Sequence, residues 1–282
     1  MVPEFFLRHD RLKTTASSSL DLNKPFDTDY VQLSNILGYA IWYDVFSNLF
    51  AGTQQSNSRR YIAMLEADVP EIQFSCITRC QNWVVVCLLK VLELQTWKRG
   101  VQVMQRHSAW DIMEKAMTIR QSLEIGITTA SLRLSHPNKH PNPIRGFNSS
   151  SNSEHDVTLV TYVYACTTAI ILEVIVSGAH PDLSAIQKHV AAIVMVLSAV
   201  QNSRLLDSLC SALCISGCMV DSSRRHIFEH LLSTMQSSSS YQLNDATEVI
   251  HECWRLRDLD VAGQGVDWAD AMKSLGKEML LI

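Results

Sequence analysis

Apolar residues recur along most of this chain at intervals of three and four, the spacing that gathers them on one face of an α-helix. The first long segment of this kind, 30–50, carries the repeat at Leu33, Ile36, Leu37, Ile41, Val45 and Leu49. The spacing predicts further helices over 59–65, 77–97, 109–134, 157–177, 182–200, 204–217, 222–235, 243–258 and 267–280. No segment alternates between apolar and polar residues as a half-buried strand does. The pattern therefore predicts an all-α fold, a single domain of antiparallel helices packed in a solenoid-like array.

Two polar segments interrupt the helical pattern. Residues 1–29 are predicted to form a loop-rich amino-terminal segment, and 135–156, where prolines, asparagines and serines gather, a flexible surface loop. Since similar helices lie on both sides of that loop, we expect one helical domain over 30–282. Gly178 is expected to end one helix and Pro181 to begin the next. Candidate N-cap residues are Asp182, Asp221 and Asn244.

The composition favours a large buried core and argues against binding to nucleic acid. Of the 282 residues, 47% are hydrophobic and only 18% are charged, which provides enough apolar surface for one extensive interior. The formal net charge is -4, whereas proteins that bind DNA unaided gather lysine and arginine on one face. We therefore expect no direct contact with nucleic acid.

The amino terminus does not resemble a secretion signal, because no basic segment precedes a short apolar one. We therefore expect an intracellular protein with reduced cysteines and an unused glycosylation sequon at Asn148. The least charged stretch, 157–172, is shorter than the roughly 20 residues that cross a bilayer and is followed by Glu173. We expect a buried core helix there, and a membrane span is the less favoured alternative.

Several short segments follow one another in the order found in one family of helical regulators. They are Trp42-Tyr43-Asp44-Val45 ahead of Gly52, Cys80-Gln81-Asn82 ahead of an apolar helix that ends at Trp97, the Tyr- and Ala-containing stretch 160–172, Gly217-Cys218, Arg224-Arg225 and Cys253-Trp254. In this order, over residues 30–270, the chain resembles the fungal-specific transcription factor domain. That domain is the all-helical regulatory region that usually follows a binuclear zinc-cluster DNA-binding module.

The resemblance implies a helical module of the fungal nucleus that activates, represses or dimerises a regulator, often of a biosynthetic pathway. The resemblance implies no catalytic residue and no cofactor, because no catalytic residues are established for the family. Zinc-cluster regulators begin with six closely spaced cysteines, in which CxxC pairs bind two metal ions, and this sequence contains no CxxC pair. We therefore expect DNA to be reached through a protein partner, either a DNA-binding regulator or a second copy of the chain.

The sharpest local motif is an HxxEH pattern that starts at His226 and ends at His230. On a helix both imidazoles lie on one face with Glu229 beside them, as in the inverted zinc-protease motif. A working site also needs a third protein ligand, for which Glu248 and Glu252 are candidates. The apolar residues between and after the histidines favour surface histidines on a packed helix, and we expect no metal site.

Three cysteines recur every four residues, at Cys210, Cys214 and Cys218, and therefore share one stripe of a helix. Such a row would bind a soft metal or sense oxidants if a neighbouring cation lowered a thiol pKa. The neighbours are apolar instead, which raises thiol pKa values and favours inert packing.

A nucleophile, a base and an orienting acid are also present as Cys253, His251 and Asp258. Cys253 lies two positions after His251, so a helix directs the two side chains to different faces. We therefore assign no catalytic residue.

Aromatic and methionine side chains would line an apolar ligand pocket, since such pockets are mostly apolar with a few polar anchors. The candidates are Trp42, Tyr43, Trp83, Trp97, Trp110 and the ten methionines. Residues of these types at helical spacing usually belong to a core. We therefore keep an apolar small molecule as a candidate ligand but assign no residues to its binding.

Two functions from different classes are consistent with these features. The favoured one is a regulator without its own DNA-binding module, which controls a fungal metabolic or secondary-metabolite gene cluster through protein partners. It is expected in the nucleus, with the cytoplasm as the alternative. The second is an enzyme of secondary metabolism, resembling a cyclase or pericyclase, or a carrier, which orients a reactive apolar intermediate inside the same helical shell.

Overall fold

A computed structural model describes residues 28–51, 57–67, 72–103, 109–136, 151–200, 205–206, 208–236, 241–260 and 265–277. Every regular element in those ranges is a helix, which confirms the all-α prediction. Several predicted features lie outside the described residues: nearly all of the loop-rich segment 1–29, Gly52, and the centre of the loop 135–156 with Asn148.

The helices are α1 (Thr28–Ala51), α2 (Ser58–Leu65), α3 (Phe74–Ile77), α4 (Asn82–Val103), α5 (Ala109–Ser135), α6 (Ser151–Ser177), α7 (Ser184–Leu197), α9 (Cys210–Cys218), the 3-10 turn η2 (Ser222–Arg224), α10 (Arg225–Gln236), α11 (Tyr241–Leu259) and α12 (Trp268–Ser274). Most bounds lie within a few residues of those that the apolar spacing predicts. A clear difference is α6, which begins inside the segment predicted as a loop.

The central helix is α6. It packs against α4, α5, α7 and α9. It is the one described helix that is long and apolar enough to cross a membrane, with a mean hydropathy of 2.0, but 94% of its apolar window is buried inside the protein. A helix that is covered by other helices on all sides has no face in contact with water and therefore needs no polar face. The apolar stretch at 157–172 is therefore explained as a core helix.

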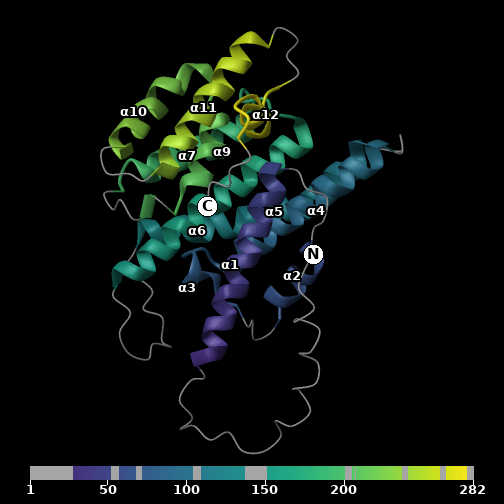
Figure 1. The fold of residues 1–282 in the computed structure, drawn as a ribbon, viewed down its shortest axis with the longest axis vertical. Coiled ribbons are helices and arrows are strands. Elements are labelled where there is room, and N and C mark those ends of the chain that lie inside the picture. The colour runs from purple at the N-terminus through teal and green to yellow at the C-terminus, as the bar shows by residue number, and fades with distance from the viewer. Residues whose placement is uncertain are drawn as a thin grey trace, which may run out of the picture.

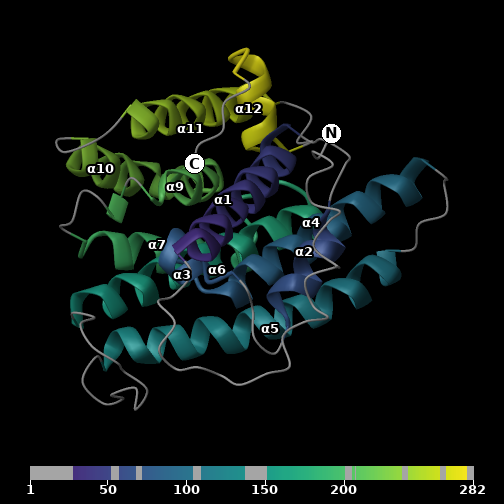
Figure 2. The ribbon, with the colours of Figure 1, turned by 60° about the horizontal axis from the view of Figure 1, so that its bottom comes forward.

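The remaining helices form layers on both sides of α6. In Figure 2, α5 lies along one side of α4 and α6, whereas α9, α10, α11 and α12 lie toward the opposite side. The first helix, α1, contacts α3, α4 and α12, so segments from the two ends of the chain lie side by side (Figure 1). One cluster of buried apolar residues extends through these layers.

Aromatic contacts attach α1 to the centre of the molecule. The ring of Trp42 lies 5.1 Å from that of Tyr164 on α6, nearly perpendicular to it, and 4.8 Å from that of Phe46. Edge-to-face pairs of this kind add to the stabilisation that burial alone provides. Farther along the same face, Val45 and Leu49 are also buried, so the later part of the apolar repeat of α1 faces the core, whereas Leu33 and Ile36 at its start are exposed.

The prediction of one helix over 77–97 is wrong at its start, because the chain ends α3, turns, and begins α4 at Asn82. Arg79 in this turn has a φ of 61°, a left-handed conformation that cannot continue a helix. The Asn82 side chain donates a hydrogen bond to the carbonyl of Ile72 at 2.7 Å and accepts one from the backbone amide of Phe74 at 2.9 Å. These bonds to earlier parts of the chain hold the turn, and apolar spacing does not reveal them.

The prediction of one helix over 204–217 is also wrong. Leu205 and Leu206 are helical, Ser208 lies in a turn, and α9 begins after it. The Tyr164 hydroxyl of α6 donates a hydrogen bond to the carbonyl of Ser208 at 2.8 Å. The turn is therefore fixed by a contact with the central helix.

The helix ends agree with the sequence predictions at two positions. Gly178 ends α6 with a φ of 94°, in the left-handed region where glycine is strongly favoured. The Asp221 carboxylate accepts a hydrogen bond from the backbone amide of Arg224 at 3.0 Å, which caps η2.

Three other predictions about helix ends are wrong. Pro181 and Asp182 lie in a turn before α7, whose N-cap is Leu183 without a side-chain hydrogen bond. Asn244 lies inside α11, because that helix begins at Tyr241. The helix α7 begins two residues after the start of the predicted segment 182–200, and α11 begins two residues before the predicted segment 243–258.

The last helix is shorter than the predicted segment 267–280. Asp267 caps its start through a capping box, and the helix ends where Gly276 has a φ of 63°. The amide of Lys277 then bonds to the carbonyl of Met272 at 3.0 Å, as in a Schellman motif. This ending turns the chain back toward α11.

An ionic group joins α5, α6 and α7. Arg120 of α5 donates two hydrogen bonds to the carboxylate of Glu173 on α6, at 2.8 and 3.1 Å. Next to it, burial and the charge of Lys188 lower the pKa of His189 to about 4, although the carboxylates of Glu173 and Glu124 act in the opposite direction. Desolvation therefore outweighs the nearby negative charges and keeps this imidazole neutral.

Acid is expected to destabilise the protein through His189. The pKa of His189 is about 4 in the folded protein and about 6.5 in an unfolded chain, so the unfolded chain takes up the proton first. The contribution of the neutral imidazole is complete above about pH 6.5 and is lost as the pH falls, by about 2 kcal/mol between pH 7 and pH 5. Urea unfolding at both pH values measures this loss. His189→Gln removes most of it, and an unchanged pH dependence in that variant would contradict the assignment.

Candidate functional site

Residues that carry the family resemblance near the carboxyl end meet between α9 and α11. A Cβ atom added at Gly217 would lie 2.6 Å from Cδ1 of Ile250 and 2.7 Å from Cε1 of Phe228. The carbonyl of Gly217 accepts a hydrogen bond from Nε1 of Trp254 at 2.9 Å. Glycine at this position therefore lets α11 approach α9 closely, and the indole joins the two helices.

Arg225 connects α10 to the same place. It donates hydrogen bonds to both carboxylate oxygens of Asp258, each at 2.8 Å, and these bonds lower the pKa of Asp258. The guanidinium also lies 5.4 Å from the ring centroid of Trp254, a favourable cation–π distance. Trp254 thus contacts both Gly217 and Arg225, so these signature residues act in helix packing.

The HxxEH motif does not assemble a metal site. His226, Glu229 and His230 are all exposed on α10. Glu229 pairs with Nε2 of His251 on α11 at 2.9 Å. Among the residues that the structure describes, no group of three or more histidine, cysteine, aspartate or glutamate side chains is placed to hold a metal ion.

Both candidates for the third metal ligand have other partners. Glu248 binds the ammonium group of Lys277, which also lies 2.9 Å from the carboxylate of Asp245. Glu252 accepts hydrogen bonds from Arg255 and Ser274, which lower its pKa to about 2. These contacts attach the carboxyl-terminal turn and α12 to α11.

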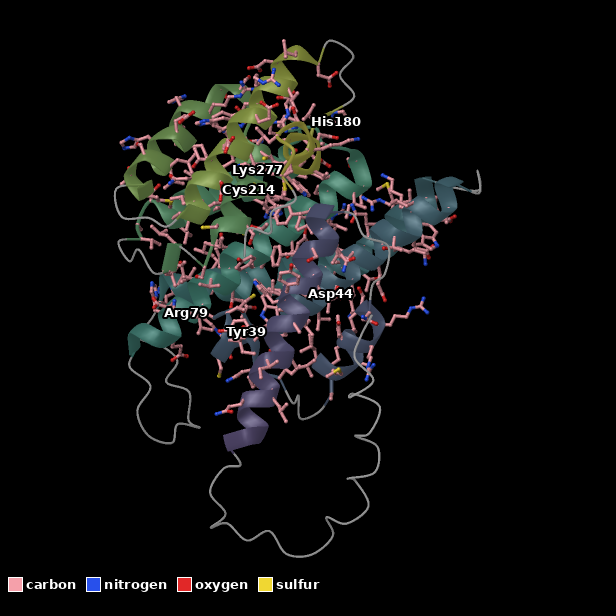
Figure 3. All side chains as sticks on the ribbon, in the orientation of Figure 1. Tyr39, Asp44, Arg79, His180, Cys214 and Lys277 are labelled. Carbon is pink, nitrogen blue, oxygen red and sulfur yellow. The ribbon has the colours of Figure 1, made fainter. Side chains whose placement is uncertain are left out.

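The three-cysteine row lies inside the protein. Cys210, Cys214 and Cys218 are at most 1% exposed, and Figure 3 places Cys214 among the carboxy-terminal helices. Burial raises the pKa of the Cys218 thiol far above its usual range. A thiol that stays protonated and out of contact with solvent is a poor nucleophile and metal ligand, which supports the packing interpretation.

Cys253, His251 and Asp258 do not form a catalytic group. Cys253 is buried, and a hydrogen bond with Cys218, together with burial, raises the pKa of its thiol. His251 is exposed and pairs with Glu229, whereas Asp258 pairs with Arg225. The three side chains therefore serve separate contacts.

The aromatic residues proposed for one pocket are distributed over several environments. Trp42 is buried in the core, whereas Tyr43 and Trp110 are exposed. Trp83 lines a groove between α4 and α5, and Trp97 lines a different one. The structure therefore does not gather these five residues around one cavity.

An apolar stripe runs along the outer face of α5, and the sequence pattern alone did not identify it as an interaction surface. Its members are Trp110, Met113, Met117, Ile125 and Leu132, all 48–75% exposed. The opposite face of the same helix supplies Ile112, Ala116, Ile119, Leu123 and Ala130 to the core. The sequence did contain a signal for this stripe, namely a second row of apolar residues at helical spacing. Apolar periodicity does not show which of the two rows is exposed.

A second outer stripe lies on α1. Leu33, Ile36, Tyr39 and Tyr43 recur at spacings of three and four, and each is more than half exposed. Figure 3 labels Tyr39 along this helix. Exposed apolar rows of this kind are typical of protein contact surfaces, so α1 and α5 both qualify as candidate interaction surfaces.

The chain is similar to one known protein family over nearly its entire length. The family model described as the fungal specific transcription factor domain matches residues 8–282. That match confirms the resemblance inferred from the ordered segments. No solved structure matches the chain.

Several named relatives are similar over most of this chain. Transcription factor ntnD of Nectria sp is 29% identical over 87% of the chain and 41% of its own length. The trichothecene biosynthesis transcription regulator TRI10 of Fusarium sporotrichioides is 29% identical over 74% of the chain and 46% of its own length. The ustiloxin B cluster transcription factor ustR of Aspergillus flavus is 26% identical over 95% of the chain and 46% of its own length. The chain thus spans less than half the length of these three relatives.

Proposed function

Because this chain belongs to the family of fungal specific transcription factor domains, we propose that it regulates a fungal secondary-metabolite gene cluster through contacts with a protein partner. The observation that carries this proposal is the family match over residues 8–282. Relatives named as regulators of trichothecene biosynthesis and of the ustiloxin B cluster support the choice of pathway type.

The charge distribution supports a role in protein contacts. The net charge is -4, and several basic side chains already form ion pairs, among them Arg120, Arg225 and Lys277. A DNA-binding face would need many uncompensated lysines and arginines. We therefore assign DNA contact to a DNA-binding regulator that acts with this domain in the nucleus. A second copy of the chain is the other candidate partner, but it would not supply the DNA contact.

We assign the partner contact to the outer stripe of α5. Trp110, Met113 and Met117 form its most aromatic and methionine-rich part, and flexible methionines adapt well to a partner surface. Glu114 and Glu124 flank the stripe and form no ion pair with a described residue. This surface suits an amphipathic helix with an apolar face bordered by lysine or arginine.

Transcript measurements in the fungal host test the proposal. Deleting the gene is expected to change the transcript levels of a biosynthetic cluster, and the intact gene restores them. The double variant Met113→Lys and Met117→Lys is expected to behave like the deletion, because it places positive charge on the surface that receives a basic partner. Both side chains are exposed, so stability should change by less than about 0.5 kcal/mol.

Thr118→Lys is the matched control, because Thr118 is exposed next to Met117 but lies about 100° farther around the helix. This variant is expected to restore the transcripts. Unchanged transcripts in the deletion strain would overturn the regulatory role. Full restoration by the double methionine variant would overturn only the assignment of the α5 surface.

The second hypothesis, an enzyme or carrier of secondary metabolism, is not favoured. The relatives described above are named as transcription factors or transcription regulators. The candidate nucleophile Cys253 is buried, and the candidate base His251 is exposed on the same helix. Neither observation supports a catalytic role.

A further inference from the structure

A groove of about 700 Å³ opens between α2, α4, α5 and α6. This volume lies in the range of pockets that hold small organic molecules. Its walls include the apolar side chains of Leu65, Trp83, Val86, Ile125 and Ala130. The groove shares Ile125 with the outer stripe of α5 but is not lined by Trp110, Met113 or Met117, so it lies apart from the part of the stripe that is proposed to contact a partner.

The indole of Trp83 is held in place as part of the groove wall. Its Nε1 donates a hydrogen bond to Oε1 of Gln81 at 2.9 Å, and the backbone amide of Gln81 donates one to the hydroxyl of Thr161 on α6 at 3.1 Å. The ring also packs against Gly126 of α5, where an added Cβ atom would lie only 2.2 Å from it. A rigid aromatic wall of this kind lowers the entropic cost of binding a flat molecule.

Most polar groups around the groove are already paired. The hydroxyls of Ser122, Thr129 and Thr158 each donate to a carbonyl of their own helix. Lys90 binds the carboxylate of Glu66 at 2.6 Å. The remaining hydrogen-bonding capacity of the groove is therefore concentrated in few groups.

Arg133 differs from these lining residues. It lies on α5 at the edge of the groove and is exposed, and no described carboxylate lies within ion-pair distance of it. An arginine beside an apolar surface is well suited to bind a carboxylate through two parallel hydrogen bonds. The groove thus combines an apolar wall with a positive charge that no carboxylate in the described part of the chain pairs with.

We propose that this groove binds a flat, largely apolar small molecule that carries one carboxylate. The body of the ligand lies against Trp83, Val86 and Ile125, and its carboxylate pairs with Arg133. This ligand site goes beyond the proposed contact with a protein partner and does not depend on which genes are regulated.

Two fluorescent dyes of nearly the same shape test the proposal with the purified full chain. The anion 1-anilinonaphthalene-8-sulfonate carries one negative charge, and N-phenyl-1-naphthylamine is its neutral counterpart. Both are expected to bind saturably with increased fluorescence. Arg133→Gln is expected to weaken binding of the anionic dye about tenfold, which corresponds to one charge-assisted hydrogen-bonded pair, and to leave binding of the neutral dye unchanged.

Variants that fill the groove test whether the dyes bind in it. Thr129→Trp places an indole in the groove and is expected to abolish saturable binding of both dyes, as is Ser122→Trp from the same helix. Thr128→Trp is the matched control, because Thr128 is exposed on α5 but does not line the groove; it is expected to bind like the unmodified protein. Arg60→Gln removes a cation from the neighbouring groove and is expected to have no effect.

Two results would overturn the proposal. One is binding of both dyes to Thr129→Trp and Ser122→Trp with unchanged affinity. The other is a loss of anionic-dye affinity in Arg133→Gln that is no larger than the loss for the neutral dye. Either result leaves the transcript experiments unaffected, so this inference and the regulatory proposal are tested separately.

Discussion

Alanine in place of Gly217 is expected to lower the free energy of unfolding by about 2 kcal/mol, and valine by about 4 kcal/mol. In a helix, alanine normally stabilises by about 1 kcal/mol relative to glycine. Here the new Cβ atom would lie 2.6 Å from Ile250 and 2.7 Å from Phe228. Both of those side chains are fully buried, so they cannot move away without disturbing other contacts, and the steric cost outweighs the helix preference.

Urea unfolding of the purified variants measures this effect, and Gly100 provides the control. Gly100 is an exposed glycine in α4, and an added Cβ atom there would have no other atom within 4 Å. Gly100→Ala is therefore expected to stabilise the protein by about 0.5 to 1 kcal/mol. If Gly217→Ala stabilised the protein as much as Gly100→Ala does, the close packing of α9 and α11 would be incorrect.

The sequence alone predicts the helical class well, because strands and loops rarely carry long apolar repeats at helical spacing. It does not predict where a helix is interrupted by a contact from elsewhere in the chain. The turn before α4 depends on bonds from Asn82 to Ile72 and Phe74. The turn at Ser208 depends on Tyr164, 44 positions earlier. The spacing of apolar residues near each turn does not reveal the hydrogen-bond partner that fixes it.

The same limit applies to the candidate sites. The sequence identifies Gly217 and Trp254 as signature residues, but their hydrogen bond joins positions 37 apart, so only the fold shows that they act in packing. The HxxEH motif is local and therefore visible in the sequence. Of the two proposed third ligands, Glu252 pairs with Arg255 only three positions along the same helix, whereas Glu248 pairs with Lys277, 29 positions away, a contact that only the fold shows.

The outer stripes of α1 and α5 show a different limit of sequence-based prediction, because apolar spacing does not distinguish an exposed row from a buried one. A helix with one buried and one exposed apolar row has the same spacing as a helix buried on two sides. Met117 on the outside of α5 and Ala116 on the inside are adjacent in the chain. Apolar spacing alone does not assign each residue to one of the two rows, whereas burial in the fold separates the exposed row from the interior.

Trp42→Ala is expected to lower the free energy of unfolding by about 4 kcal/mol, the usual cost of removing a large buried aromatic side chain. Trp42 is 5% exposed, and its ring contacts Phe46, Phe74 and Tyr164 at centroid distances of 4.8, 6.0 and 5.1 Å. Its removal leaves a cavity where α1 meets α3 and α6. Urea unfolding measures the loss.

The neighbouring residue gives the matched comparison, because Tyr43 is 57% exposed and belongs to the outer stripe of α1. Tyr43→Ala is expected to change stability by less than about 0.5 kcal/mol. Successive residues of a helix point about 100° apart, so this pair of variants reports which face of α1 packs on the core. A larger loss for Tyr43→Ala than for Trp42→Ala would mean that α1 is rotated about its axis. In that case the row from Leu33 to Tyr43 would be core and not a candidate interaction surface.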